Sequence, residues 1–90
     1  MSKAVVDPGE LRRFAQELKR FNQSLRDNMG LLQARLNELG QTWRDQEQVK
    51  FTEEFDQTVR VLARFADAAD KHVPFLIRKA EKIEEYLQQR

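Results

Sequence analysis

Residues 39–51, LGQTWRDQEQVKF, contain the only tryptophan of the chain and separate two long stretches of helical pattern. Gly40 precedes the tryptophan, and a left-handed glycine commonly ends a helix. Thr42 and Asp45 are residue types that cap helix N-termini, so we expect Thr42 to cap a second helix that begins just after Trp43. The stretch therefore predicts a helical hairpin whose turn covers residues 40–43.

The first helix begins in the segment VVDPGELRRF, residues 5–14. Asp7 can cap the helix, Pro8 suits its first position, and Glu10 completes a pattern that resembles a capping box. The apolar residues that follow are three or four positions apart, with one extra step of four that predicts a stutter. This pattern predicts a helix over about residues 8–39, with a seam at Leu11, Phe14, Leu18, Phe21, Leu25, Met29, Leu32, Leu36, Leu39 and Trp43.

The second half of the chain has the same spacing, again with one extra step of four. Two such apolar stripes joined by a short turn bury each other when the helices fold antiparallel. The fold class that we predict is therefore all-α. The second seam consists of Phe51, Phe55, Thr58, Leu62, Phe65, Ala69, Val73, Leu76, Ala80, Ile83 and Leu87.

Pro74 interrupts the second helical pattern. A proline inside a helix removes one backbone hydrogen bond and kinks or breaks the rod, so we expect a helix over about 44–73 and a kinked or separate helical segment over about 75–89. Folding about residues 41 and 42 would place Pro8 level with about residue 75, and the overhang would project about 20 Å.

Apolar residues on such an overhang need a cover, so the segment either bends back or packs on a second chain. We favour the second chain, which predicts dimerisation into an assembly like a four-helix bundle. We expect a homodimer, with a heterodimer with a related hairpin as the alternative. The candidate interface residues are Val73, Phe75, Leu76, Ile77, Ile83, Tyr86 and Leu87.

Composition limits the functional classes. Ninety residues form one domain, and 16 basic against 15 acidic residues give no overall attraction to nucleic acid. The N-terminal MSKAVVDPG becomes polar too early for a cleavable signal peptide, and no apolar stretch reaches the roughly 18 residues of a membrane span. We therefore expect synthesis in the cytoplasm without a cleavable signal.

The chain has no cysteine, one histidine and no catalytic or phosphate-binding motif. His72 has no second nitrogen ligand at metal spacing, and the adjacent Glu53 and Glu54 do not share a helix face. We expect no enzyme activity, cofactor, metal or small-molecule substrate. A basic stripe in the first helix is interpreted as a solvated face whose charges meet acidic residues of the second helix or of another subunit, in preference to a nucleic-acid site. It consists of Arg12, Arg13, Lys19, Arg20 and Arg26.

Trp43 has two interpretations at this stage. It can plug the open end of the hairpin at the turn, or it can contribute to an interface, because tryptophan is a common binding anchor. The phenylalanines on the two seams are interpreted as core residues.

The whole chain resembles the WXG family of small helical hairpins associated with type VII, or ESX-type, secretion. The resemblance rests on size, two long amphipathic helices, Trp43 at the turn and the aromatic Phe51 eight residues later. The family has Trp-x-Gly, whereas this chain has Trp43-Arg44-Asp45, so Asp45 replaces the glycine and can begin the helix. The turn-motif residues are thus Trp43, Asp45 and Phe51.

The resemblance implies a protein-interaction module that forms four-helix dimers and is exported by an ATPase-driven machine, or that is a partner of a larger exported effector. Secreted members tend to carry Tyr-x-x-x-Asp/Glu near the C-terminus, but Tyr86 is followed at this spacing by Arg90. The alternative is a cytosolic, dimeric coiled-coil adaptor or structural protein that is not exported.

Overall fold

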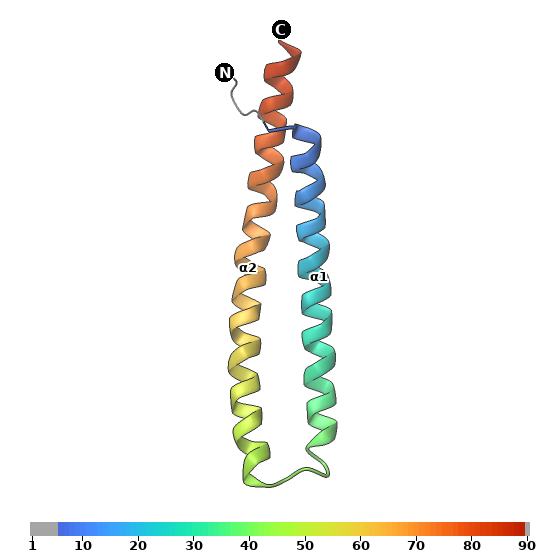
Figure 1. Cartoon of the computed structure of the whole chain (residues 1–90), viewed down its shortest axis with the longest axis vertical. Coiled ribbons are helices and arrows are strands. Elements are labelled where there is room, and N and C mark those ends of the chain that lie inside the picture. The colour runs from blue at the N-terminus through green and yellow to red at the C-terminus, as the bar shows by residue number, and fades with distance from the viewer. Residues whose placement is uncertain (1–5, 90) are drawn as a thin grey trace.

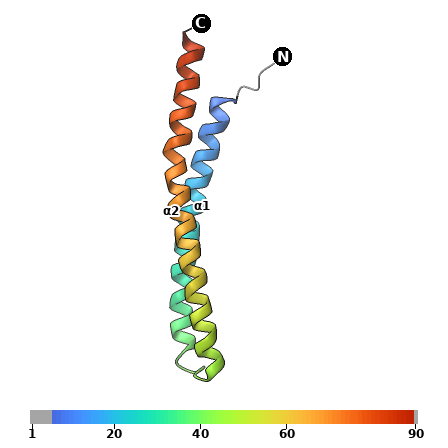
Figure 2. The same cartoon turned by 90° about the vertical axis from the view of Figure 1, so that its left-hand side faces the viewer.

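The computed structural model describes residues 6–89 as two antiparallel helices that lie side by side along a rod of 68 × 21 × 17 Å (Figure 1). Helix α1 spans Pro8–Leu39 and helix α2 spans Gln46–Gln88, and residues 6–89 contain no strand. The second view shows the helices crossing one another at a shallow angle (Figure 2). The predicted all-α hairpin is therefore confirmed. Residues 1–5, part of the signal-peptide argument, and Arg90 lie outside the described residues.

Both helices begin at aspartates. The Asp7 carboxylate accepts a hydrogen bond of 2.9 Å from the backbone N–H of Gly9, and Pro8 is the first helical residue, as predicted. The cap of α2 is Asp45, which accepts a 3.0 Å hydrogen bond from the N–H of Gln48. The predicted cap, Thr42, instead donates its hydroxyl to a carbonyl at the end of α1, so the turn covers residues 40–45 and not 40–43.

The left-handed stop predicted at Gly40 is wrong. Gly40 has φ −63° and ψ −14°, which any residue adopts, and its N–H bonds to the carbonyl of Leu36 at 3.0 Å. The chain then leaves the helix through short turns, in which the N–H groups of Gln41 and Thr42 bond to carbonyls three residues earlier. The last turn of α1 therefore tightens without an inversion of handedness.

The seam between the helices differs from the predicted one by single positions. In α1 the fully buried residues are Ala15 and Asn22, next to the predicted Phe14 and Phe21, which are about half exposed. In α2 Ala66 is fully buried where Phe65 was predicted. With these replacements α1 steps by four and three without interruption from Leu11 to Met29, so the predicted stutter does not exist there. Beyond Met29 the predicted seam residues Leu32 and Leu39 are about half exposed. Small side chains occupy the contact line because they let two helices approach closely.

Helix α2 continues through Pro74 without a break (Figure 1). The predicted boundary at residue 73 is therefore wrong, and of the two alternatives predicted after Pro74, a kink or a separate segment over 75–89, the separate segment is not present. Pro74 deprives the carbonyl of Asp70 of its helical donor. The proline itself is exposed, and the turns on either side keep their contacts with α1, including fully buried Ala80.

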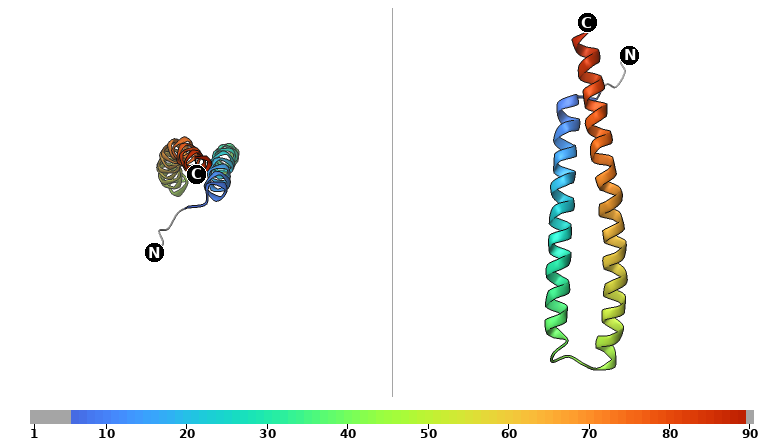
Figure 3. Two further views of the ribbon diagram at one scale, coloured as in Figure 1. Left: turned by 90° about the horizontal axis from the view of Figure 1, so that it is seen from above. Right: turned by 180° about the vertical axis from the view of Figure 1, so that it is seen from behind.

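The register of the hairpin also differs from the predicted one. Asn22 bonds to the carbonyl of Ala66, and the midpoint between these two paired residues is residue 44. The prediction placed this midpoint at residues 41 and 42. Consequently α1 reaches further along α2, and Arg12 pairs with Glu84. A short end of α2 still extends past the start of α1 (Figure 3), but the long uncovered overhang is not present.

Candidate functional site

An aromatic cluster closes the turn end of the hairpin. The ring centroids of Trp43 and Phe51 are 6.0 Å apart, and those of Phe51 and Phe55 are 5.9 Å apart in a stacked arrangement. Trp43 is partly buried, and its backbone N–H bonds to the carbonyl of Leu39 at 2.9 Å. The two aromatics quoted from the sequence are thus in contact, and Trp43 packs against the first turns of α2.

The hairpin has two broad faces of opposite character, and three consecutive residues of α2 show how they arise. Successive side chains of a helix point about 100° apart, so Phe65, Ala66 and Asp67 point to one face, to the seam and to the other face. Phe65 meets Phe21 of α1 edge to face, with ring centroids 6.3 Å apart. Asp67 meets Arg26 of α1, with a nitrogen-to-oxygen distance of 2.8 Å.

The apolar face is the one that carries Phe21 and Phe65. Its large side chains remain between 44% and 55% exposed, although they come from both helices. Near the turn a shallow apolar groove passes between the helices, lined in part by Leu32, Leu39 and Phe51. We define the apolar face by Phe14, Phe21, Leu32, Leu39, Phe51 and Phe65.

The ionic face lies on the other side of the seam. Arg12 donates two hydrogen bonds to the Glu84 carboxylate, at 2.9 and 2.8 Å, and Arg26 contacts both Asp67 and Asp70. We define the ionic face by Arg12, Arg26, Asp67, Asp70 and Glu84. The interpretation that basic residues of the first helix meet acids of the second is supported for these two arginines.

Asn22 connects the ionic face to the seam. It is fully buried, and its amide nitrogen donates to the Asp70 carboxylate at 2.8 Å and to the Ala66 carbonyl at 3.4 Å. Sequence reasoning missed this residue because Phe21, one position earlier, is more hydrophobic. The uninterrupted spacing of four and three through Asn22 was the signal that could have identified it.

The contacts of the ionic face shift the pKa values of its groups. The hydrogen bond from Asn22, followed by that from Arg26, lowers the pKa of Asp70 below its usual value. The hydrogen bond from Arg12 likewise lowers the pKa of Glu84. In return, the hydrogen bond to Glu84 raises the pKa of Arg12. Each ionised form is therefore favoured in the folded chain.

The predicted dimer residues fall into two groups. Val73, Leu76, Ile77 and Ile83 are partly buried along α2, and the pairing of Arg12 with Glu84 places them within reach of α1. The other three are exposed, and they are Phe75 at 56%, Tyr86 at 69% and Leu87 at 42%.

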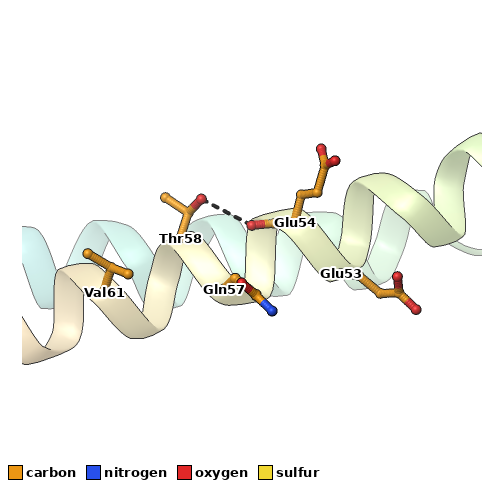
Figure 4. Close-up of a pocket in the computed structure, with 5 residues that line it drawn as sticks. All are labelled: Glu53, Glu54, Gln57, Thr58 and Val61. Atoms are coloured by element: carbon orange, nitrogen blue, oxygen red, sulfur yellow. Dashed lines mark hydrogen bonds between the residues drawn. The ribbon is translucent and has the colours of Figure 1, made fainter.

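The described residues show no arrangement typical of a catalytic or metal site. Among residues 6–89 no three His, Asp or Glu side chains are close enough to hold a metal ion. A shallow concavity on α2 contains Glu53 and Glu54, but their carboxylates point in different directions (Figure 4). The Thr58 hydroxyl there donates to the backbone carbonyl of Glu54 at 3.0 Å and not to either carboxylate. Neither helix within residues 6–89 has an apolar stretch long enough to cross a membrane.

The comparisons with known proteins identify the family. The WXG100 family, described as proteins of 100 residues with WXG, matches residues 4–88, so the chain belongs to this family. The fold is similar to the wild-type secreted protein EsxB of Bacillus anthracis, with 25% identity, a TM-score of 0.80 and coverage of 94% of this chain and 99% of that one. A glycine-to-alanine mutant of the same EsxB gives 25% identity, a TM-score of 0.77 and coverage of 93% and 97%. No curated protein matches the sequence.

Proposed function

We propose that this WXG100 protein is a non-enzymatic interaction module that pairs, through its apolar face, with a second copy of itself. In this role it is a substrate of a type VII secretion system or the partner of one. Family membership and the likeness to the secreted EsxB support the association with type VII secretion.

The observation that carries the pairing is the position of the phenylalanines. Phe14, Phe21 and Phe65 lie beside the seam and not in it, and each remains about half exposed. Complete burial of such a side chain contributes about 1.5–3 kcal/mol relative to full exposure, so a partner that covers this face gains several such increments. The fully buried side chains of the hairpin are three alanines and Asn22, so little large apolar surface is completely buried within it.

A charge introduced into the apolar face tests the pairing. We expect the wild-type chain to have a solution mass of about twice 10.7 kDa, and Phe21→Glu with Phe65→Glu to give the monomer mass, since a buried, unpaired carboxylate is strongly unfavourable. Light scattering after size-exclusion chromatography measures both. The control is Arg13→Glu with Arg20→Glu, on the exposed side of α1 that faces away from α2, which should leave the mass unchanged. A monomeric wild-type chain, or an unchanged mass of the phenylalanine variant, would contradict homodimerisation.

Export is tested in the native host. The tagged protein is compared between culture supernatant and cell lysate, with and without a working type VII ATPase, and a cytosolic protein serves as the lysis control. Appearance outside that depends on the ATPase supports the secretion role. Retention in both strains supports the resident dimeric adaptor, which the arginine at the usual acidic position after Tyr86 favours.

A further inference from the structure

Helix α2 carries a row of basic residues on the side that faces away from α1. Its members are separated by four, seven, seven and four residues, which places them along one line of the helix. All are exposed, and none takes part in the ion pairs formed within residues 6–89. We call this set the basic row: Arg60, Arg64, Lys71, Arg78 and Lys82.

An apolar depression lies within the basic row. Phe75 stands between Lys71 and Arg78 along this side of α2 and is 56% exposed. It lines a shallow pocket together with Arg78, Lys79 and Lys82, whose aliphatic stems form the walls. This side of α2 therefore offers both cationic groups and a place for one apolar side chain.

The basic row is long and narrow. From Arg60 to Lys82 it extends about 33 Å, at 1.5 Å per residue. Helix α2 as a whole carries nine acidic and seven basic residues, and Asp67, Glu81 and Glu85 lie along one edge of the row. Duplex nucleic acid or an anionic lipid surface is wider than one helix and would bring its phosphates close to these acids. A single acidic helix is narrow enough to contact the basic row without approaching the acidic residues at its edge.

We propose that the basic row binds an acidic amphipathic helix of a partner protein, lengthwise along α2, with one apolar side chain of that helix seated against Phe75. The row lies roughly 100–140° around α2 from Phe65, so it remains accessible when a second hairpin covers the apolar face. This binding surface is therefore independent of the dimer proposed above.

The test uses a defined probe and the full chain. A fluorescent helical peptide of about 22 residues carries glutamates at the spacing of the basic row and one leucine placed to meet Phe75. A second peptide has the same composition, with the glutamates distributed around the helix. Fluorescence anisotropy at low salt should show about tenfold tighter binding of the first peptide, because only its charges align with the row.

Matched variants locate the binding surface. Arg64→Glu with Arg78→Glu should weaken binding of the row peptide by about tenfold, whereas Arg13→Glu with Arg20→Glu on α1 makes the same change in net charge and should leave it within about twofold. Phe75→Ala should weaken binding while leaving its salt dependence unchanged, since it removes an apolar contact. Circular dichroism verifies helix content, and a reversal variant that loses helix is replaced by its Arg→Gln counterpart.

Three results would overturn the proposal. The first is equal affinity for the two peptides. The second is an equal loss of affinity in the double charge-reversal variants of α1 and α2. The third is tighter binding to duplex DNA or to anionic vesicles than to the peptide whose glutamates match the basic row. None of these results depends on whether the chain dimerises or is exported.

Discussion

At the scale of single residues, Asn22 links packing to electrostatics. A buried amide that bonds to an ionised carboxylate favours one alignment of the turns of α1 and α2, because a shift along the seam would break this bond and leave the buried amide unpaired. Its side-chain oxygen has no hydrogen-bond partner among residues 6–89. The unpaired oxygen costs the fold some stability. The hydrogen bond from the amide nitrogen to Asp70 favours one register of the two helices.

Replacement of this amide should destabilise the fold. We expect Asn22→Ala to lower the free energy of unfolding by about 1–3 kcal/mol, since Asp70 loses one of its two donors and the seam gains a void. Urea unfolding at a fixed protein concentration measures the change. Gln23→Ala, an exposed neighbour, should stay within about 0.5 kcal/mol. Equal effects of the two substitutions would show that Asn22 has no special role.

Replacement of Gly30, in contrast, should stabilise the fold. It lies inside α1, and a Cβ atom added there meets no other atom within 4 Å. Gly30→Ala should therefore raise the free energy of unfolding by about 1 kcal/mol, the difference in helix propensity. Gly40→Ala, at the end of the helix, should have a smaller effect. A loss of stability in Gly30→Ala would reveal that another chain occupies the space beside the glycine.

At the scale of the elements, α2 has a weak point at Pro74. The missing backbone hydrogen bond lies close to Asn22, because the carbonyl that loses its donor belongs to Asp70, whose side chain accepts a hydrogen bond from Asn22. The helix persists there because contacts with α1 continue on both sides, from Ala69 to Ala80. Packing against α1 thus outweighs the tendency of Pro74 to break the helix.

Removal of the proline should strengthen α2. We expect Pro74→Ala to raise the free energy of unfolding by up to about 3 kcal/mol, as the exposed ring has little packing to lose. Thermal unfolding followed by circular dichroism measures the gain, with His72→Ala as an exposed control. If the variant is less stable than the wild type, the ring itself makes a contact that matters, for instance with another chain.

The elements also show what the sequence can predict. The start of α1 and the antiparallel pairing depend on local residues such as Asp7 and Pro8, and both agree with the prediction. The turn contains Trp43 as predicted, but it is two residues longer than predicted. The seam was misplaced by one residue because hydrophobicity ranks Phe21 above Asn22 and Phe65 above Ala66. Only the close approach of two helices reveals that the smaller neighbour fits between them. The apolar face could not be recognised while its phenylalanines were assigned to the core.

At the scale of the whole molecule, the ionic face makes stability depend on pH. The pKa values of Asp70 and Glu84 are lowered in the folded chain. Their contribution is therefore present above the pKa of the unfolded carboxyl groups, about 4, and is lost as the pH falls through the folded values. Salt screens these partly exposed pairs, so the effect weakens at high ionic strength.

This dependence can be measured directly. We expect the melting temperature to fall between about pH 5 and pH 2, and to fall less steeply in the Asp70→Asn, Glu84→Gln double variant. Differential scanning calorimetry at low salt, with Glu53→Gln as a control outside the ionic face, provides the measurement. The same slope in the double variant and in the wild type would assign the acid sensitivity to other carboxyl groups.

The placement of small residues inside and large rings outside has a consequence for how such hairpins diverge. The fully buried side chains of the seam are alanines and one asparagine, whereas the phenylalanines of the apolar face lie beside the seam and remain about half exposed. Mutation can therefore change these exposed rings, and with them the choice of partner, without changing the residues that are fully buried in the seam. Gene duplication of such a hairpin would give rise to sets of proteins that share one fold and bind different partners.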